Sequence, residues 1–594
     1  MKKLMTMLLC LVLCFSAVAC GGDTGEAGPS ENQVVLEFFI TDGGIGSEWL
    51  KQANERFMAA NIATPYGDKE GVYCRINKGQ PSLASMATDG YHVYFMDRTQ
   101  PVADMAKTGN LLNVNEWVTE KYDERDGVMM SIEDKMFPEY RKFPQADDGE
   151  YYGIPYTEVY GGLTYDRKLF NDNGLYFAQT GKGTPYACKK FGTRYEFIKK
   201  GDNASKTCGP DGEYGTVDDG LPSCVPELVT LWYRMNQLGI FPVQLSGKYL
   251  NYATFFLDGM MTALQGEQEA AATYSLEGQV EVVVGYTNEN LFGEIDYIKK
   301  PITKTVNITE ETGYYTTWSV NKYYAIALLE IIEKEGYFTP GNALSTYSHI
   351  DCQQDFIYSG YGQNNKIGML IEASYWYNES KIRKNFDYFN TLFPEANGDR
   401  DIQWMSLPVN LANQITGEDG TATYNGITET VKGERPTLID TSRSAIVFNS
   451  RVAKQPEVLA ALEDWVKFFH TDDELSHYTI EAGMARPLNY QVKDEHKTGW
   501  NQFYTSLWEL RKNCYVLRFE GNNETFYNNT SFFARGFQDG AFTCHSATCM
   551  EEFRANRHGT KEAFEYGMRN KGSWGAMYSG SGTVGEVPGV TYNG

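Results

Sequence analysis

The chain has 594 residues, which is more than one hydrophobic core normally serves, so two or more packed lobes are expected. Hydrophobic residues make up 42% and charged residues 22%, a balance that excludes a wholly disordered chain. The formal net charge of −24 argues against nucleic acid as a partner, because phosphate binding needs clustered Lys and Arg. Aromatic residues make up 14% of the chain, and Tyr, with 41 residues, is the most frequent of them. Rings with an apolar face and a polar edge suit a surface that binds sugars. The alternative is that most of these rings belong to the core.

Residues 1–19 have the pattern of an export signal. A positively charged start precedes the apolar stretch Leu4–Val18, which is too short to span a bilayer comfortably. Small residues then lead to Cys20, an ending that resembles a bacterial lipobox, with Ala17 where Leu is more usual. The resemblance implies lipidation of Cys20, cleavage before it, and anchoring on the extracellular face of the bacterial cytoplasmic membrane. The alternative, ordinary cleavage near the same place, still exports the protein.

Residues 20–33, which begin with the lipidated Cys20, are small, polar and rich in Gly, Ser and Glu, as expected of a flexible tether. No later segment is long and apolar enough to predict a membrane crossing. Eight cysteines follow Cys20, and an even number in an exported protein permits disulfides without establishing them. Three of them share one Gly-rich insertion and would suit a local clasp: Cys188, Cys208 and Cys224.

The segments after the tether alternate between strand and helix patterns. Val34–Ile40 predicts a strand, and apolar residues at helical spacing follow over 49–58. Two more strands are predicted at Gly71–Ile76 and Tyr91–Met96, and then a helix that begins at Pro101. This order begins an open α/β sheet, whose ligands lie beyond the carboxyl ends of the strands. Three polar side chains fall at such ends: Asp42, Asp97 and Arg98.

Two further helices are predicted later in the chain. Pro456–Phe469 carries its large apolar residues on one face, and its proline sits in the first turn, where proline is tolerated. Thr471–Asp473 predicts the cap of the next helix, and Gly483 predicts its end, shortly before Arg486.

Several segments, in a fixed order, carry a resemblance to a known family. They are Asp97-Arg98 with Leu111-Leu112 after it, Tyr152–Tyr156 continuing to Phe170, Met369–Trp376, Met405–Val409, and Arg443–Phe448 followed by the two helices above. Their order, together with the lipobox, resembles the extracellular solute-binding lipoproteins of ABC importers, in the carbohydrate-binding branch of the maltose-binding type. The chain departs from the family pattern at Asp166, where Asn is usual, and at Ser374, where Gly is usual.

The resemblance implies an α/β, two-lobed periplasmic-binding-protein-like fold, with hinge crossovers and a ligand cleft between the lobes. Lobe 1 is expected to comprise residues 34–152 and 441–490. Lobe 2 is expected to comprise residues 156–436 and 495–594, with an insertion over 176–226.

The resemblance and the chemistry of sugars together predict a set of ligand-binding residues. Carboxylates accept hydrogen bonds from sugar hydroxyls, guanidinium groups donate to them, and aromatic faces stack on the C–H faces of the rings. The predicted residues are Asp42, Asp97, Arg98, Tyr156, Glu158, Tyr375, Trp376 and Arg486, with Trp376 as the leading stacking platform. Each has a structural alternative: Asp42 would stabilise its turn, Asp97-Arg98 would be a solvated ion pair, and Trp376 would be core.

The insertion contains closely spaced carboxylates on a Gly-rich backbone: Asp211, Glu213, Asp218 and Asp219. Ca²⁺ prefers several oxygen ligands from a loop able to fold around it, so this segment predicts a structural calcium site. The spacing does not match an EF-hand. The alternative is an acidic cluster of turns with no ion.

The function expected from these features is capture of a carbohydrate, an oligosaccharide, and its delivery to an ABC import permease by a monomeric, lipid-anchored protein. No catalytic residue and no cofactor besides calcium are expected, because the sequence contains no Walker A, Gly-x-Ser-x-Gly or His-Glu-x-x-His motif. Two alternatives stay open. One is a surface lipoprotein enzyme acting on glycans, which would need two carboxylates across a scissile bond, and the other is a binding protein for peptides or polyamines.

Overall fold

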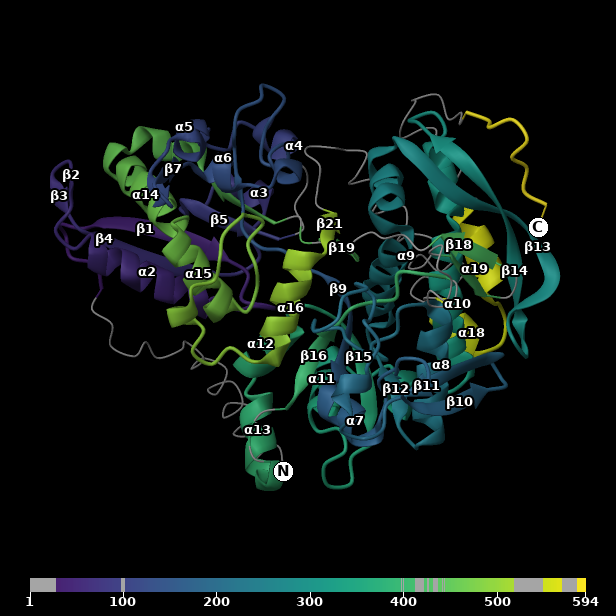
Figure 1. Cartoon of the computed structure of the whole chain (residues 1–594). Helices are drawn as coiled ribbons and strands as arrows, with labels where there is room; N and C mark the ends of the chain where they lie inside the picture. The colour runs from purple at the N-terminus through teal and green to yellow at the C-terminus, as the bar shows by residue number, and fades with distance from the viewer. Residues whose placement is uncertain are drawn as a thin grey trace, which may run out of the picture.

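The computed structural model describes residues 28–97, 102–396, 398, 400–411, 421–424, 427–430, 436–440, 442, 444–517, 549–568 and 585–593. These residues form two α/β lobes, each built around its own sheet (Figure 1). Among the helices of these ranges, none combines the length and the apolarity that a membrane crossing needs.

The first lobe contains a five-stranded sheet in the order β4-β1-β5-β20-β8. Its strands are β1 (Val34–Ile40), β4 (Val72–Lys78), β5 (Val93–Met96), β8 (Ile154–Pro155) and β20 (Ala445–Phe448). β1 pairs in parallel with β4 and β5, whereas β20 runs antiparallel between β5 and β8. The sheet therefore joins the start of the chain to a strand that lies far along it.

Helices cover the sheet of the first lobe. They include α2 (Glu48–Ala60), α14 (Pro456–Phe469) and α15 (Asp472–Ala482), which share one buried apolar core with the strands. Trp465 on α14 stacks on Phe469 and donates its indole N–H to Asn54 Oδ1 at 2.9 Å. This hydrogen bond satisfies the one polar group of a large buried ring at the contact between α14 and α2.

The second lobe contains a four-stranded sheet in the order β12-β15-β9-β16. The strands are β9 (Gly161–Asp166), β12 (Phe241–Gln244), β15 (Ile367–Ala373) and β16 (Ile402–Met405). Every residue of β9 and β15 is buried, so both faces of the sheet are covered by other elements. The long helix α9 (Ala253–Ser275) packs against β9 and β15, and α16 (Gln502–Asn513) packs against β16.

The remaining part of the second lobe extends away from the first lobe (Figure 1). A long antiparallel hairpin, β13 (Gly278–Phe292) and β14 (Ile295–Ile308), packs with α9 and α10 (Val320–Lys334). The C-terminal helices α18 (Cys549–Arg554) and α19 (Thr560–Met568) contact α10. This bulk around α10 enlarges the lobe well beyond its four-stranded sheet.

The insertion after β9 forms a hairpin of its own, β10 (Thr184–Cys188) and β11 (Thr193–Phe197), which leads into α8 (Val225–Gln237). Among the described residues, the three cysteines of the insertion are free thiols, as are Cys74, Cys352, Cys514 and Cys549. The local clasp that the sequence allowed is therefore not formed.

Smaller elements complete the two lobes. They are α3 (Leu83–Met86), α4 (Val102–Ala106), α5 (Asn115–Thr119), α6 (Ile132–Lys135), α7 (Arg167–Asn173), α11 (His349–Ile357), α12 (Trp376–Ile382), α13 (Asn385–Leu392), and the strand pairs β2 (Pro65–Tyr66) with β3 (Lys69–Glu70), β6 (Asp123–Arg125) with β7 (Val128–Met130), and β17 (Thr421–Tyr424) with β18 (Ile427–Thr430).

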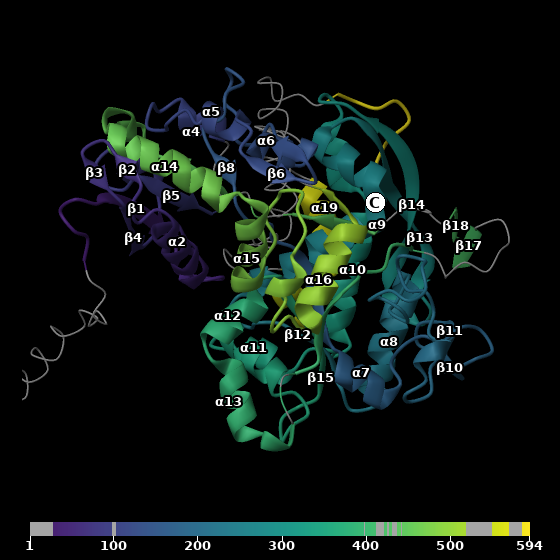
Figure 2. The same cartoon turned by 60° about the vertical axis from the view of Figure 1, so that its left-hand side comes forward.

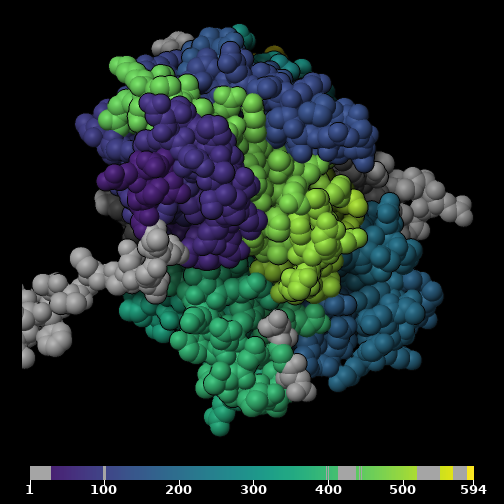
Figure 3. Space-filling view, turned by 90° about the vertical axis from the view of Figure 1, so that its left-hand side faces the viewer, coloured from purple at the N-terminus to yellow at the C-terminus, as the bar shows by residue number. Residues whose placement is uncertain are grey.

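Three stretches of chain cross between the lobes. The first connects β8 to β9 over residues 156–160, and the second leads from β19 (Thr437–Ile439) to β20. The third runs from the end of α15 to α16, after which β21 (Tyr515–Leu517) pairs in parallel with β19. The two ribbon views place α16 between the helices of the first lobe and the sheet of the second (Figure 2). In Figure 3 its yellow-green surface lies between the purple first lobe and the teal second lobe.

Candidate ligand-binding site

A cavity of about 250 Å³ lies where the two lobes face each other. The first lobe contributes the loop after β1 and the end of β5, the first two crossings contribute residues near the hinge, and the second lobe contributes Tyr375. The lining residues are Ile40, Thr41, Gly43, Gly44, Ile45, Gly46, Asp97, Tyr156, Thr157, Val159, Tyr375, Ser442 and Ser444. Both lobes and the first two crossings therefore meet at one space beyond the ends of the first-lobe strands.

Asp97 and Tyr156 form a hydrogen-bonded pair in this lining. The Tyr156 hydroxyl donates to Asp97 Oδ1, and the tyrosine ring is buried between Trp49 and Phe95. Burial raises the pKa of the Tyr156 phenol well above its usual range, and the charge of Asp97 raises it further, so the phenol keeps its proton. The Asp97 side chain is exposed, and an ionised carboxylate can accept several hydrogen bonds. The pair thus holds an oriented acceptor at the cavity.

The loop 43–46 brings the backbone of the first lobe against the second lobe. Gly44 and Gly46 have positive φ values of 58° and 66°, which a glycine adopts readily. A Cβ added at Gly46 would lie 2.8 Å from Ile382 Cδ1, the end of an exposed side chain of the second lobe. Asn378 Nδ2 also donates across the gap to the carbonyl oxygen of Ile45 at 3.4 Å. The lobes are therefore in contact beside the cavity.

Tyr375 and Trp376 are neighbours in sequence but have different surroundings. Tyr375 is half-buried and lines the cavity, whereas Trp376 is 0% exposed. The Trp376 indole N–H donates to Thr164 Oγ1 on β9 at 3.0 Å, and its ring packs edge-on against Phe356 and Phe503. A fully enclosed ring presents no face to a ligand, so the structure places Trp376 in the core and Tyr375 at the cavity.

Asp42 does not line the cavity and stabilises the turn after β1. Its carboxylate accepts hydrogen bonds from Ser47 Oγ at 2.7 Å and from Lys78 Nζ at 3.0 Å. Burial opposes ionisation, but the hydrogen bonds from Ser47 and Lys78 outweigh it and hold the pKa of Asp42 below its usual value. Asp42 therefore takes the turn-stabilising position that was its alternative, while its neighbours Thr41 and Gly43 line the cavity.

Glu158 and Arg486 are both fully buried near the hinge and do not line the cavity. Glu158 accepts hydrogen bonds from the Tyr160 hydroxyl and from Arg511 Nε, the latter at 2.6 Å. Arg486 donates to the carbonyl oxygen of Phe469 at 3.1 Å and packs over its ring at 4.5 Å. Burial lowers the pKa of Arg486 to about 10. The two residues hold the crossings in place.

Two further residues singled out from the sequence, Arg98 and Cys20, lie outside the described residues.

Several hydroxyl groups at the cavity were not predicted from the sequence: Thr41, Thr157, Ser442 and Ser444. Two of them lie at the first-lobe ends of the crossings: Thr157 directly after Tyr156, and Ser444 directly before β20. Their signal in the sequence was their position beside recognisable strands, because ligands of open α/β sheets bind beyond the strand ends. Single Ser and Thr residues carry no spacing pattern that would have selected them.

Asp440 is a buried acid that joins the first two crossings. Its Oδ1 accepts hydrogen bonds from the backbone N–H groups of Val159 and Ser442, both at 2.9 Å, and its Oδ2 accepts one from the Tyr140 hydroxyl. Burial and then the charge of Glu158 raise the pKa of Asp440 to about 6. The hinge therefore contains two buried carboxyl groups that repel each other when both are ionised.

The four carboxylates of the insertion do not gather around one point. Asp218 is buried and accepts a hydrogen bond from Thr216 Oγ1 at 2.8 Å, and it lies beside Asp211. Burial and the neighbouring Asp211 charge raise the pKa of Asp218 to about 8. Asp219 accepts instead from the Gly215 N–H at 2.9 Å, and Glu213 is exposed. Within the described ranges, no three of these four residues bring ligand atoms within 4.8 Å of one another.

Comparisons with known proteins find likeness in structure rather than in sequence. No model of a protein family matches the chain, and a search of curated proteins gives no match. A probable secreted solute-binding lipoprotein from Streptomyces coelicolor is similar, with a TM-score of 0.50 and 11% identity, over 91% of this chain and 99% of that one. The GacH receptor of Streptomyces glaucescens has a TM-score of 0.49 and 11% identity, over 92% and 99% of the two chains. Maltose-bound MalE3 of T. maritima has a TM-score of 0.48 and 14% identity, over 90% and 98%.

At these identities the likeness concerns the fold alone. The predicted α/β architecture of two lobes joined by crossings is confirmed by the two sheets and by the match that spans nearly all of both chains. The chain therefore has the two-lobed fold of extracellular solute-binding proteins.

Proposed function

We propose that this protein binds a carbohydrate, an oligosaccharide, in the cavity between its lobes and does not transform it. The observation that carries the proposal is the juxtaposition of the Asp97–Tyr156 pair on the first lobe with the Tyr375 ring on the second. Sugars combine hydroxyl groups with apolar C–H faces, so a carboxylate opposite an aromatic ring suits them better than an apolar pocket would.

Closure of the lobes is part of the proposed binding cycle. The cavity of about 250 Å³ is smaller than the roughly 300–1,000 Å³ of most ligand pockets, so an oligosaccharide would enter with the lobes further apart. A ligand that contacts both Asp97 and Tyr375 stabilises the closed arrangement, because it gains contacts with the second wall only after closure.

Capture is favoured over hydrolysis by the composition of the lining. Among the described residues that line the cavity, Asp97 is the one carboxylate. A glycosidase needs two carboxyl groups on opposite sides of the scissile bond. Glu158, the acid within the first crossing, is paired with Arg511 and does not line the cavity.

Delivery to an ABC import permease and anchoring through Cys20 extend the proposal. The anchor is supported by the lipobox-like ending of the signal and by the small, polar residues 20–33 that follow it. We expect the wild-type precursor to fractionate with membranes and the Cys20→Ser precursor to be released. Recovery of both in the membrane fraction would contradict the lipid anchor.

The ligand class is tested with the soluble chain from Gly21 onward, in a thermal-shift screen against oligosaccharides, peptides and polyamines, followed by calorimetry. We expect stabilisation by an oligosaccharide, and loss of most of that stabilisation in Asp97→Asn. Asp42→Asn is the matched control. It removes the charge of a carboxylate that lies between two lining residues in the sequence but does not itself line the cavity. Stabilisation by peptides or polyamines alone would overturn the sugar assignment, and release of shorter sugars would favour an enzyme.

The insertion is proposed to bind Ca²⁺ in a structural role. The proposal is supported by the neighbouring carboxylates Asp211 and Asp218, whose mutual repulsion a divalent cation would relieve. Glu213 and Asp219 would need to turn inward to complete the ligand set.

A further inference from the structure

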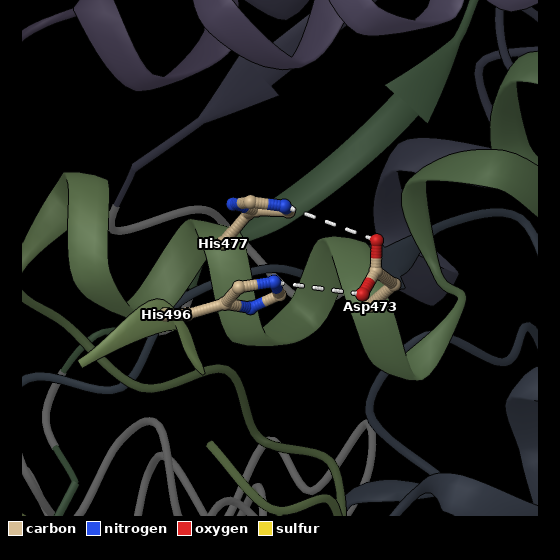
Figure 4. Close-up of side chains that lie close together, drawn as sticks. All are labelled: Asp473, His477 and His496. Atoms are coloured by element: carbon tan, nitrogen blue, oxygen red, sulfur yellow. Dashed lines mark ion pairs between the residues drawn. The ribbon is translucent and has the colours of Figure 1, made fainter. Parts of the chain in front are cut away.

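A cluster of three potential metal ligands lies on the first lobe, on α15 and the segment after it (Figure 4). It comprises Asp473, His477 and His496. None of the three lines the cavity between the lobes. Within the described residues, this is the one group of three or more such side chains whose ligand atoms lie within 4.8 Å of one another.

The helix and the following segment bring the three side chains together in different ways. Asp473 and His477 are four residues apart on α15, which places them on the same face of the helix. His496 comes from the segment after the helix, and its ring stacks on that of His477 with centroids 3.9 Å apart. Figure 4 shows one nitrogen of each ring directed at the Asp473 carboxylate.

The ligand atoms are close enough for one metal ion once the two rings reorient. His477 Nε2 lies 3.8 Å from Asp473 Oδ2, and His496 Nε2 lies 3.7 Å from Asp473 Oδ1. Two ligands of a tetrahedral Zn²⁺ with bonds of about 2.0–2.1 Å are separated by about 3.3 Å. Because the two distances end on different oxygens of Asp473 and the two rings are stacked, one ion would require the rings to turn out of the stack until both Nε2 atoms face the same point.

His496 has a hydrogen-bond partner at its other ring nitrogen, and His477 has a carboxylate further off on the corresponding side. His496 Nδ1 lies 2.8 Å from Ser476 Oγ, and His477 Nδ1 lies 3.9 Å from Glu481 Oε1. With the proton on Nδ1, both rings direct the lone pair of Nε2 toward Asp473. A hydrogen bond such as the one between His496 and Ser476 fixes the tautomer and the ring orientation of histidines that bind metals.

We propose that Asp473, His477 and His496 bind one Zn²⁺ ion, with water as the fourth ligand. Two imidazole nitrogens, one carboxylate oxygen and an open position form a ligand set that Zn²⁺ accepts in proteins. The side chains of His477 and His496 are 27% and 13% exposed, and that of Asp473 is 50% exposed, so the site is accessible from solvent. The bound ion would clip α15 to the segment that leads into the third crossing.

Lys493 competes with the metal in the metal-free protein. Its Nζ lies 2.6 Å from Asp473 Oδ1, the oxygen that faces His496. The Lys493 side chain is 39% exposed, so it can move into solvent when the ion binds. If the cluster is a zinc site, removing the Lys493 charge should strengthen zinc binding. If the cluster is only a network of ion pairs, the same change would weaken the network and give no zinc binding. A Lys493 variant therefore distinguishes a zinc site from a network of ion pairs.

The test is a Zn²⁺ titration of the soluble chain, produced without a histidine tag and stripped with a chelator. We expect one equivalent to bind, with affinity reduced about 100-fold or more in His477→Ala and His496→Ala and about tenfold in Ser476→Ala. Lys493→Ala should bind more tightly than wild type. His558→Ala is the matched control, because His558 is another partly exposed histidine beside an acid, and it should leave the titration unchanged.

The thermal midpoint gives the second measurement. In chelator, His477→Gln and His496→Gln should melt close to wild type, and Zn²⁺ should raise the midpoint of wild type but not of these variants. Zinc binding that is equally strong without either histidine, or the absence of stoichiometric binding by wild type, would overturn the site. The ligand for the cavity plays no part in this test, so its outcome is independent of the proposed sugar binding.

Discussion

Arg511 Nε donates to Glu158 Oε2 at 2.6 Å, and both side chains are buried where the first and third crossings meet. The same guanidinium donates through its Nη2 to the carbonyl oxygens of Arg486 and Leu488, at 2.9 and 3.0 Å. One cation of α16 thus ties two of the three chain segments that connect the lobes. The hinge is held by a buried ion pair rather than by apolar packing alone.

Removal of this cation should destabilise the whole protein. We expect Arg511→Met to lower the free energy of unfolding by about 3–5 kcal/mol, because Glu158 would be left as a buried charge without its partner. The double variant Glu158→Gln/Arg511→Met should lose clearly less, as measured by urea denaturation. Arg75→Met, at an exposed ion pair with Glu37, is the control and should cost no more than about 1 kcal/mol. Equal losses at the two arginines would refute the hinge assignment.

Asp440 gives the hinge a pH dependence of known sign. The folded pKa of about 6 lies above the usual aspartate value, so only the folded state keeps this proton between about pH 4 and 6. The contribution of Asp440 to stability is complete at low pH and is lost as the pH rises through 6. Asp440→Asn should be more stable than wild type by about 2 kcal/mol at pH 7.5, and the difference should vanish near pH 4.

The geometry at Asp440 makes the substitution conservative. An Asn Oδ1 can still accept from the N–H groups of Val159 and Ser442, and its Nδ2 can donate to the Tyr140 oxygen. Unfolding curves of both proteins across this pH range provide the measurement. A variant that is less stable at every pH would show that the ionised carboxylate is required at the hinge.

Two adjacent aromatic residues should respond in opposite ways to truncation. Trp376→Ala should lower the free energy of unfolding by about 3–5 kcal/mol, because its ring is fully buried. Tyr375→Ala should cost less stability and should remove most of the thermal shift produced by the sugar. Melting curves with and without ligand separate the two effects. A ligand shift that survives in Tyr375→Ala would exclude this ring as a binding surface.

Gly46 should resist substitution because of its backbone conformation. Its φ of 66° lies in the left-handed region, so we expect Gly46→Ala to lower the free energy of unfolding by about 1–2 kcal/mol. The added Cβ would lie 2.8 Å from Ile382 Cδ1, but that atom ends an exposed side chain, which can turn aside. The double variant Gly46→Ala/Ile382→Ala should therefore be no more stable than Gly46→Ala, as measured by urea denaturation. Full rescue by Ile382→Ala would show that the contact between the lobes, rather than φ, requires glycine here.

Calcium should affect Asp218 in a way that distinguishes a site from an acidic turn. Without Ca²⁺ at pH 7, Asp218→Asn should be at least as stable as wild type, because burial and Asp211 disfavour the charged form. With Ca²⁺, wild type should gain thermal stability and the variant should gain little. If Ca²⁺ does not change the thermal midpoint of wild type, the insertion is an acidic cluster of turns without a calcium site.

The parts of the fold with local signals were predictable from the sequence. β1 alternates between buried and less buried residues, and α14 begins at Pro456 and ends at Phe469 as its pattern predicts. For α15, Thr471 accepts a hydrogen bond from the Glu474 N–H, and Gly483 ends the helix with a φ of 67°. These signals depend on residues within a few positions of one another, so no knowledge of the tertiary structure was needed.

The site was less predictable, because it depends on direction and on distant partners. Tyr375, Trp376 and Tyr377 are all aromatic, and no periodic pattern shows which of them turns inward at the start of α12. Glu158 was predicted at the cleft, but its side chain is instead buried in an ion pair with Arg511, 353 residues later in the chain. A pairing over such a distance leaves no trace in local composition.

The strand order of the two sheets sets the order in which they can fold. All four strands of the second sheet lie between residues 161 and 405, whereas the first sheet needs β20, at residues 445–448, to connect β5 with β8. During synthesis, the sheet that begins first is thus the last to be completed. Until β20 arrives, one side of β5 is an unpaired edge, and such edges promote aggregation. Chains interrupted between residues 405 and 445 should therefore contain one complete sheet and one that is open to association with other chains.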